Sequence, residues 1–391
     1  DQVIISTIKA RQVYDSRGNP TVEADVVLES GVIGRAIVPS GASTGSHEAL
    51  ELRDGDPSKF RGRSVYRAID NIHTVIAPRL AGASVADQAE LDRTLIELDG
   101  TENKGRLGAN ALLAVSAAAA WAAANESALP LYRSLGGELG RELPMPQTQV
   151  IGGGTHAGGT IDVQDFSVIP IGASSFTECV EMLFNVQWST RDAMQARGKP
   201  VSVADEGGFW PTFDRNEEGL EVLMEGIERS GYRPMEDVAI GLDIASNQFY
   251  HDGSYRFELE NRTMSSAEFT DLLEGWTERY PILSIEDGMA EDDWRGWELL
   301  TRRLGDRVQI IGDDLFTTDV DRIGQGIERG IANAALIKMN QIGTITETID
   351  AIRLCQKAGY LPVVSGRSGD SEDVTYVHIA VATNAGQIKN G

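Results

Sequence analysis

Short apolar runs separated by helix-length segments dominate the chain after residue 145. Eight runs can be counted, at residues 146–151, 166–171, 201–204, 238–242, 282–285, 308–311, 334–337 and 361–365. Amphipathic helical patterns lie between the later runs, at residues 216–229, 265–279, 294–304, 319–329 and 345–358. Buried strands that alternate with helices in this way predict a β/α barrel. The first two runs are too close together for a helix, so we expect the barrel to begin with a hairpin-like pair.

The first third of the chain has a different pattern. Runs of strand-forming residues at 3–10, 21–28 and 34–38 are separated by turn residues, which predicts a small antiparallel sheet. An alanine-rich helical pattern follows at 108–125, and Pro144 and Pro146 mark the expected boundary. We therefore predict an α/β chain with an α+β lid or capping domain at residues 1–140 and a modified, TIM-like β/α barrel as the catalytic domain at residues 141–391.

Charged residues end four successive apolar runs. Asp243, Glu286 and Asp313 end three of them, and Lys338 ends the next. Because the carboxyl ends of parallel strands meet at one end of a barrel, we expect these side chains to gather there. Three carboxylates in a low dielectric repel one another strongly, and a divalent cation neutralises them. The pattern predicts a metal site beside a lysine that holds its proton less tightly than usual.

Composition and charge narrow the choice of partners. The 35 basic and 59 acidic residues give a net charge of −24, which argues against nucleic acid and anionic membranes. No run of 18 apolar residues occurs, and the first residues lack a signal pattern. Cys179 and Cys355 lie in apolar, helix-like surroundings and are predicted to be buried free thiols. We expect a soluble cytoplasmic protein.

Other polar groups beside the apolar runs supply candidate chemistry. They are Gln164 and Asp165 at the second run, Glu206 after the third, Arg367 and Ser368 after the eighth, and His156 in the glycine-rich loop 152–159. An arginine fork next to a hydroxyl suits a phosphate or a carboxylate. In the first third, the short-residue loop 39–45 is a candidate lid over a ligand.

Seven motifs, taken together and in order, resemble the enolase family. They are Tyr-Asp-Ser-Arg-Gly-Asn-Pro-Thr at 14–21, Pro-Ser-Gly-Ala-Ser-Thr-Gly at 39–45, Ala-Asp-Glu-Gly-Gly-Phe at 204–209, Ser-Ile-Glu-Asp-Gly at 284–288, Gly-Asp-Asp-Leu at 312–315, Leu-Ile-Lys-Met-Asn-Gln-Ile-Gly at 336–343 and Ala-Gly-Gln-Ile-Lys at 385–389. The resemblance covers almost the whole chain. It implies a lid-bearing α+β domain, a barrel that opens ββαα, and a homo-oligomer, dimeric or higher. Enolases continue past the last motif with a helical tail, whereas this sequence stops at Gly391, so we expect either a missing tail or no last helix.

The resemblance implies a metal-assisted proton abstraction. Asp243, Glu286 and Asp313 match the ligands of the first of two Mg²⁺ ions, and Ser43 matches the lid residue that helps to hold the second. Lys338 matches the base that removes the proton α to the substrate carboxylate. Removal of that proton makes a dianion, which two divalent ions and a lysine stabilise.

The resemblance also implies how the substrate is held and how its hydroxide departs. Glu206 matches the acid that helps the hydroxide to leave, and Asp165 stands at a second carboxylate position of the same catalytic group. The expected substrate is a small phosphorylated three-carbon acid, 2-phosphoglycerate or an enolpyruvate phosphate. Its expected contacts are Lys389 at the carboxylate, Arg367 and Ser368 at the phosphate, His156 from a closing loop, and Gln164.

Several positions depart from the family pattern. Gly366 follows Ser365 where enolases read Ser-His-Arg-Ser, and Asp165 stands where they have glutamate. Glycines replace polar residues in the loop 152–159, and Asn247-Gln248 replaces a Ser-Glu pair. The leaving-group half has therefore lost an imidazole and shortened a carboxylate. We expect a loss of ordinary hydratase activity on the order of 10² or more if the imidazole transfers a proton.

Three functions remain open from the sequence. The favoured hypothesis is a diverged paralogue in phosphonate natural-product (antibiotic) biosynthesis, similar to carboxyphosphonoenolpyruvate synthase, in which the room left by the missing imidazole admits phosphonoformate as a co-substrate. The rival is a glycolytic enolase that interconverts 2-phosphoglycerate and phosphoenolpyruvate. A non-catalytic binding protein with an enolase fold is the third, although its charged cluster would be expected to decay.

Overall fold

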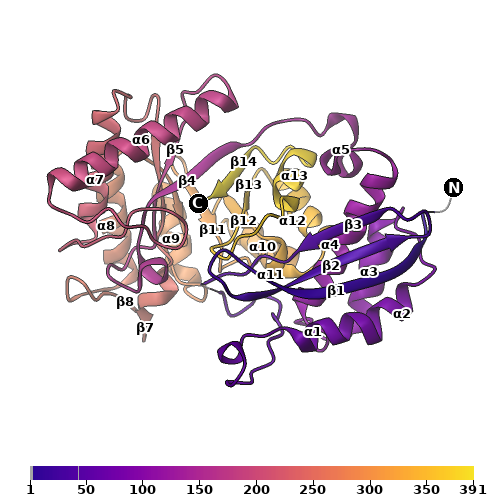
Figure 1. Cartoon of the computed structure of the whole chain (residues 1–391). Helices are drawn as coiled ribbons and strands as arrows, with labels where there is room; N and C mark the ends of the chain where they lie inside the picture. Colours follow the sequence, from indigo (N-terminus) through magenta and orange to yellow (C-terminus); the bar gives the residue numbers. More distant parts are fainter. Residues whose placement is uncertain (1–2, 43) are drawn as a thin grey trace.

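The N-terminal part of the molecule is a three-stranded antiparallel sheet backed by helices (Figure 1). A computed structural model of the chain describes residues 3–42 and 44–391. The sheet has the order β1 (Ile5–Tyr14), β2 (Pro20–Leu28), β3 (Ile33–Ile37). The helices are α1 (Tyr66–Asn71), α2 (Ala77–Leu80), α3 (Gln88–Asp99), α4 (Ala109–Glu126) and α5 (Leu131–Gly136). This arrangement confirms the antiparallel sheet and the alanine-rich helix that the sequence predicted.

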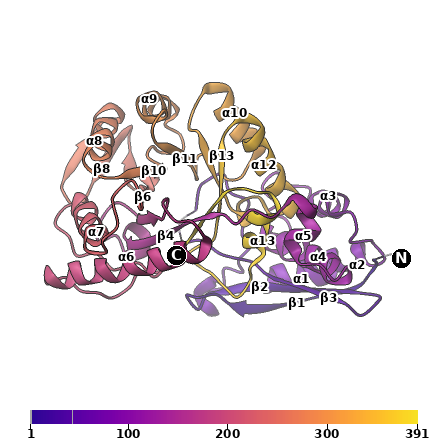
Figure 2. The same ribbon diagram turned by 90° about the horizontal axis from the view of Figure 1, so that it is seen from above.

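Close packing explains the alanine-rich composition of α4. This helix lies against β2 and β3, and Figure 2 shows it alongside one face of the sheet. A Cβ atom on Gly34 would lie 2.1 Å from the carbonyl oxygen of Ala118 and from the backbone nitrogen of Ala122. Only small residues allow a helix and a strand to approach so closely.

The rest of the chain forms a closed eight-stranded barrel. Its strands are β4 (Met145–Gly152), β5 (Asp165–Ile169), β6 (Ala239–Asp243), β10 (Ile282–Glu286), β11 (Gln309–Gly312), β12 (Ala334–Ile337), β13 (Leu361–Ser365) and β14 (Gln387–Asn390). The strand β5 is antiparallel to both β4 and β6, and the remaining pairs are parallel. The barrel thus opens with a hairpin, as expected.

Helices connect the barrel strands. They are α6 (Phe176–Ala196), α7 (Glu217–Arg229), α8 (Ser266–Arg279), α9 (Trp294–Leu304), α10 (Val320–Arg329), α11 (Met339–Ile342), α12 (Ile345–Ala358) and α13 (Thr375–Ala382). Two of them, α6 and α7, follow the hairpin, which gives the expected ββαα opening. A small three-stranded antiparallel sheet of β7 (Tyr250–His251), β8 (Ser254–Phe257) and β9 (Arg262–Met264) precedes α8. The N-terminus of α8 carries a capping box between Ser265 and Glu268, which fixes where that helix begins.

One of the eight predicted barrel strands is wrong. Residues 201–204 form no barrel strand, and Val203 makes only an isolated bridge with Phe209 and is 59% exposed. The eighth strand is instead β14, which closes the barrel between β13 and β4. Polar and charged residues make up most of β14, so no apolar run marked it in the sequence.

Two other expectations can be compared with the structure. Cys179 and Cys355 are buried and free, as expected. In the part of the chain that the structure describes, no single helix is long and apolar enough to cross a membrane. The bent pair Ala109–Glu126 and Leu131–Leu139 has the length and composition for it, but α4 is mostly buried inside the protein.

Candidate active site

The predicted charged residues meet at the carboxyl ends of the barrel strands. Asp243 and Glu286 are the last residues of β6 and β10 and lie opposite each other in the strand register. Asp313 follows β11, and Lys338 follows β12 and caps α11. Lys389 lies in β14 on the other side of the barrel opening. The sequence correctly predicted this gathering because each charge stands where a buried strand emerges.

Two lysines pair with these carboxylates. Lys338 Nζ lies 2.7 Å from Asp313 Oδ2. Lys389 Nζ lies 2.7 Å from Glu286 Oε2 and 3.4 Å from Asp243 Oδ2. All five side chains are nearly or fully buried. The ion pairs therefore lie in a low dielectric, where their mutual attraction is strong.

The buried charges shift one another's pKa values. Burial and the Asp243 carboxylate raise the pKa of Glu286 well above its usual value. Burial acts to lower the pKa of Lys338, but the Asp313 carboxylate outweighs burial and raises it. The expected loosening of the Lys338 proton is thus not a property of the side chains alone. It requires the charge of Asp313 to be neutralised, as a cation bound there would do.

The carboxylates have the chemistry to hold a divalent cation. Glu286 is fully buried, and its Oε1 atom has no hydrogen-bond partner among the residues that the structure describes. A buried carboxylate oxygen without a partner is costly, and a cation would satisfy it. The predicted ligands Asp243, Glu286 and Asp313 are not, however, a compact set, because the Lys389 amine lies between the first two. Ser43, the fourth predicted ligand, lies outside the described residues.

A second acid supports Asp313. Asp287 accepts the backbone N–H of Asp313 at 2.8 Å and that of Asp314 at 2.9 Å. The ligand oxygens of Asp287, Asp313 and Asp314 lie within 4.8 Å of one another. Burial and the charge of Asp313 raise the pKa of Asp314 to about 8. Asp287 therefore fixes the turn that presents Asp313.

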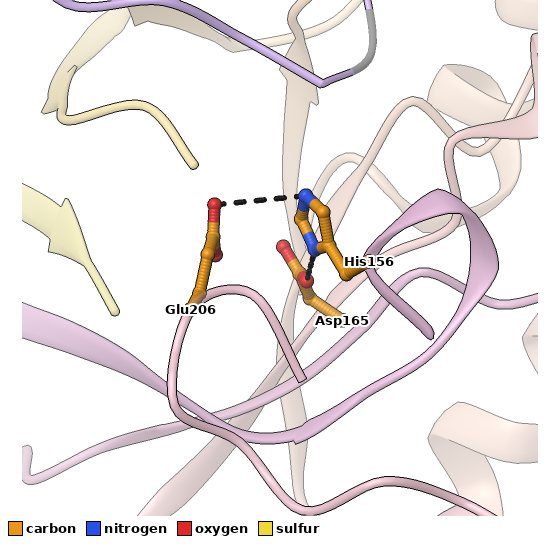
Figure 3. A group of neighbouring side chains, drawn as sticks. All are labelled: His156, Asp165 and Glu206. Atoms are coloured by element: carbon orange, nitrogen blue, oxygen red, sulfur yellow. Dashed lines mark hydrogen bonds and ion pairs between the residues drawn. The ribbon is translucent and has the colours of Figure 1, made fainter. Parts of the chain in front are cut away.

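On the opposite side of the cavity, an imidazole lies between two carboxylates (Figure 3). His156 Nδ1 is 3.0 Å from Asp165 Oδ1, and His156 Nε2 is 3.6 Å from Glu206 Oε1. The histidine comes from the turn after β4, and Asp165 is the first residue of β5. Because β5 runs antiparallel to its neighbours, its first residue reaches the same end of the barrel as the last residues of the other strands.

The two carboxylates hold a proton on this imidazole. Burial acts to lower the pKa of His156, but the charges of Asp165 and Glu206 outweigh burial and raise the pKa to about 9. Burial and the Asp165 charge raise the pKa of Glu206. Asp165 has a lowered pKa because Lys389 and His156 outweigh its burial. At neutral pH, His156 is therefore a cation between an ionised Asp165 and a carboxyl group with raised proton affinity.

Two amide side chains contact the residues of this site. Gln164 donates from Nε2 to Asp243 Oδ2 at 3.0 Å. Gln149, in β4, lies 3.1 Å from His156 Nδ1 through its Nε2 atom and accepts the Gly208 N–H at 3.1 Å through its Oε1 atom. Sequence reasoning missed Gln149. The available signal was the cluster of polar residues Gln147, Thr148 and Gln149 inside a predicted buried strand.

The loop 39–45 contacts the predicted phosphate-binding residues. Ser368 Oγ accepts the backbone N–H of Ala42 at 2.8 Å. Ser40 and Gly369 exchange backbone hydrogen bonds of 3.1 and 2.7 Å. Arg367 is buried, and its guanidinium lies 3.4 Å from Glu48 Oε2. The described part of this loop thus lies against the end of β13, in the place expected of a lid.

One cavity of about 40 Å³ connects the two sides of this site. Of the described residues singled out from the sequence as catalytic, substrate-binding or metal-binding, all except Glu286 line it: His156, Gln164, Asp165, Glu206, Asp243, Asp313, Lys338, Arg367, Ser368 and Lys389. Glu286 lies just beneath, under the Lys389 amine. The cavity places an amine base, several acids and an arginine around one small, polar space.

Fold and site together define a β/α-barrel enzyme whose active site is touched by a loop of a separate α+β part. Family models agree: the enolase N-terminal domain matches residues 5–135, and the enolase C-terminal TIM barrel domain matches residues 141–391. Enolase 1 of Desulfitobacterium hafniense (strain Y51) is 56% identical over 390 residues, which cover 99% of this chain and 89% of that protein. The chain belongs to the enolase family.

Proposed function

We propose that this enolase-family enzyme catalyses the reversible dehydration of 2-phosphoglycerate to phosphoenolpyruvate. The observation that carries the proposal is the shared cavity, in which Lys338 lies on one side and Glu206 on the other. An amine base and a carboxyl acid on opposite sides of one substrate suit the removal of a proton and of a hydroxide from adjacent carbons. The 56% identity to a protein named Enolase 1 supports the same reaction.

In the proposed mechanism, Lys338 accepts the proton from the carbon next to the substrate carboxylate. Asp313 holds the amine at 2.7 Å and so fixes its direction. Two Mg²⁺ ions, when bound by Asp243, Glu286, Asp313 and the lid residue Ser43, would supply positive charge against the developing dianion. Lys389 binds the carboxylate of the substrate, which replaces part of its contact with Glu286 and Asp243.

The leaving group departs on the other side of the cavity. Glu206 donates a proton to the hydroxyl group, which leaves as water, and the raised pKa of Glu206 suits that role. His156 lies between Glu206 and Asp165, and its positive charge offsets the negative charge of Asp165. Arg367 and Ser368 bind the phosphate. Gln164 orients Asp243 and contributes to the floor of the substrate site.

The proposal includes the organisation of the chain. We place the division between the lid domain and the barrel domain at residues 140 and 141, next to the start of β4. We also infer a homo-oligomer, by analogy with the family, and a cytoplasmic location. The buried free thiols of Cys179 and Cys355 are compatible with a reducing compartment.

The comparisons do not support the phosphonate hypothesis that the sequence favoured. The room expected beside Gly366 is mostly filled, because the ring of Tyr376 lies there. The remaining cavity behind Gly366 measures about 10 Å³. That is about the space that one water molecule needs, and it does not suit phosphonoformate.

A turnover assay tests the proposal. Purified protein with Mg²⁺ and 2-phosphoglycerate should form phosphoenolpyruvate, and a chelator should stop the reaction. Lys338→Ala should lower the rate by about 10³-fold or more. Lys104→Ala is the matched control, because Lys104 is also buried and paired, 3.2 Å from Glu347, yet lies outside the cavity.

Other outcomes of the same assay would contradict the proposal. The paralogue would be favoured if the protein formed no phosphoenolpyruvate from 2-phosphoglycerate alone but formed a phosphonate-containing product when phosphonoformate was added. Absence of any product, together with no Mg²⁺ binding in a calorimetric titration, would favour the non-catalytic binding protein.

A further inference from the structure

A buried threonine with a strained backbone lies next to the residues that hold the amine base. Thr318 is fully buried and has a positive φ of 58°, and its neighbour Thr317 has a φ of 46°. Side chains branched at Cβ rarely adopt this left-handed conformation, because the Cβ atom then crowds the backbone. Strained residues persist where the surrounding structure holds them, and they gather at functional sites. The strain indicates that contacts of Thr318 keep the turn in this shape.

The strained turn follows directly on Asp313, at the end of β11. The Asp313 carbonyl accepts the backbone N–H of Thr317 at 2.8 Å. The two left-handed residues then reverse the chain, and the side chain of Asp319 caps the start of α10. This reversal brings the Thr318 hydroxyl to the start of α11, where it accepts the backbone N–H of Lys338 at 3.0 Å.

A buried amide joins this hydroxyl to Asp313. Gln341 is 1% exposed, and its Oε1 atom accepts the Thr318 hydroxyl at 2.7 Å. Its Nε2 atom donates to Asp313 Oδ1 at 2.8 Å. The other carboxylate oxygen, Asp313 Oδ2, lies 2.7 Å from Lys338 Nζ. A closed ring of hydrogen bonds results, and its members are Thr318, Gln341, Asp313 and Lys338.

The ring can close in only one sense. Because the Thr318 hydroxyl accepts the Lys338 N–H, its own proton is available for Gln341 Oε1. The amide then presents its NH₂ group to Asp313, since an amide oxygen in that place would be repelled by the carboxylate. Two donors thus fix the carboxylate of Asp313, and the Lys338 amine is held at one defined oxygen.

We propose that Thr318 and Gln341 are positioning residues for proton abstraction by Lys338. They fix the carboxylate of Asp313, and this carboxylate in turn directs the Lys338 amine at the edge of the active-site cavity, which Asp313 and Lys338 both line. The inference rests on the proposed function, because it assigns the ring to the base of that reaction. It goes further by naming the groups that set the geometry of the base.

Removal of one hydroxyl tests the proposal. Thr318→Val keeps the shape and the branching at Cβ, but it removes the donor to Gln341 and the acceptor for the Lys338 N–H. The kcat for 2-phosphoglycerate should fall by about 10-fold or more with KM changed less than about 2-fold, because a misplaced base slows the chemical step more than it weakens binding. Exchange of the substrate proton with deuterated water should fall by the same factor, since Lys338 carries out that step.

The neighbouring threonine supplies a matched control. Thr317 is equally buried and has the same left-handed backbone. Within the described chain, however, its hydroxyl bonds to the His47 carbonyl at 3.5 Å and to no member of the ring. Thr317→Val should leave kcat and proton exchange within about 2-fold of the wild type, because the base keeps its geometry. Equal kcat values for Thr317→Val and Thr318→Val would overturn the proposal, whatever their melting temperatures.

A double-variant cycle tests whether the two residues act through one ring. Gln341→Leu should lower kcat at least as much as Thr318→Val, since it removes the donor to Asp313 directly. In the Gln341→Leu background, Thr318→Val should lower kcat by no more than about 2-fold further, because the path from the hydroxyl to the carboxylate is already broken. Independent effects that multiply would overturn the ring as the means of positioning.

The proposed function and this inference fail in different ways. Turnover in the wild type together with full turnover in Thr318→Val would overturn only the inference. If the wild type neither turns over 2-phosphoglycerate nor exchanges its proton, the proposed function fails, and the role of the ring in catalysis fails with it. The melting temperatures of the four proteins in the cycle then test the contacts themselves. Decreases that are not additive would support the ring, and additive decreases would overturn it.

Discussion

The two sides of the active-site cavity are built in different ways. The side around Lys338 takes its charged groups from the ends of consecutive parallel strands, where one carboxylate or amine follows each buried run. The side around Glu206 takes its groups from loops and from the antiparallel strand β5. The first side matches the motifs that the sequence resemblance implies, whereas the second has an aspartate and a glycine where that resemblance implies a glutamate and a histidine.

This difference concerns how the groups on each side are held. A strand end is fixed by the hydrogen bonds of its neighbours on both sides, and a loop group has fewer fixed neighbours. The two departures from the expected pattern nevertheless both lie at strand ends, because Asp165 is the first residue of β5 and Gly366 directly follows β13. Tyr376 packs next to Gly366, and His156 pairs directly with Asp165.

The largest effect should come from the side built on strand ends. Glu286→Gln removes the carboxylate whose Oε1 atom has no partner within residues 3–42 and 44–391, and should weaken Mg²⁺ binding by about 100-fold or more, since charged oxygen ligands dominate magnesium affinity. Calorimetric titration with MgCl₂ measures this. Glu347→Gln is the control, because that residue pairs with a lysine outside the cavity. Equal affinities of the Glu286 variant and the wild type would exclude Glu286 as a ligand.

The loop-built side should make the free energy of unfolding depend on pH. The pKa of His156 is raised from 6.5 to about 9 in the folded protein. Its stabilising contribution is therefore complete below pH 6.5 and is lost as the pH rises through about 9. That contribution is on the order of 1 to 3 kcal/mol. His156→Gln should lose it, so its unfolding free energy should fall less than that of the wild type between these pH values. If plots of unfolding free energy against pH, measured by urea unfolding, are parallel for the wild type and the variant, the raised pKa of His156 is contradicted.

The smallest effect should come from the support beneath a strand end. Asp287→Asn leaves one oxygen for the two backbone N–H groups of Asp313 and Asp314, and should weaken Mg²⁺ binding by about 10-fold through misplacement of Asp313. Asp306→Asn, at an exposed position, is the control. If the Asp287 variant loses no affinity, the turn at Asp313 is rigid without this support.

The sequence predicted residues on both sides of the cavity, but it did not predict all of the strands that carry them. A charged residue ends each of four buried runs: Asp243, Glu286, Asp313 and Lys338. Such a pattern involves only neighbouring residues, so it can be recognised in the sequence. The strand β14 escaped prediction because it consists largely of polar residues that face the cavity or their neighbours. The run at 201–204 was mistaken for a strand because a short apolar stretch does not reveal how exposed it is.

Contacts between distant segments could not be predicted from the sequence. Gln149 meets Gly208, Asp287 meets Asp313, and Tyr376 meets Gly366 only after the barrel has closed. The missing imidazole at position 366 was visible in the sequence, but the phenol that fills its space was not. For this reason the sequence alone favoured a second reactant in a space that the structure shows to be small.

Exchange of the substrate proton next to the carboxylate with solvent distinguishes the roles of the two sides of the cavity most directly. In deuterated water with Mg²⁺, Glu206→Gln should still exchange the proton next to the carboxylate of 2-phosphoglycerate while forming little phosphoenolpyruvate, because Lys338 remains. Lys338→Ala should lose both exchange and dehydration. Exchange at the wild-type rate in Lys338→Ala would contradict the assignment of Lys338 as the base, and with it the proposed division of the cavity.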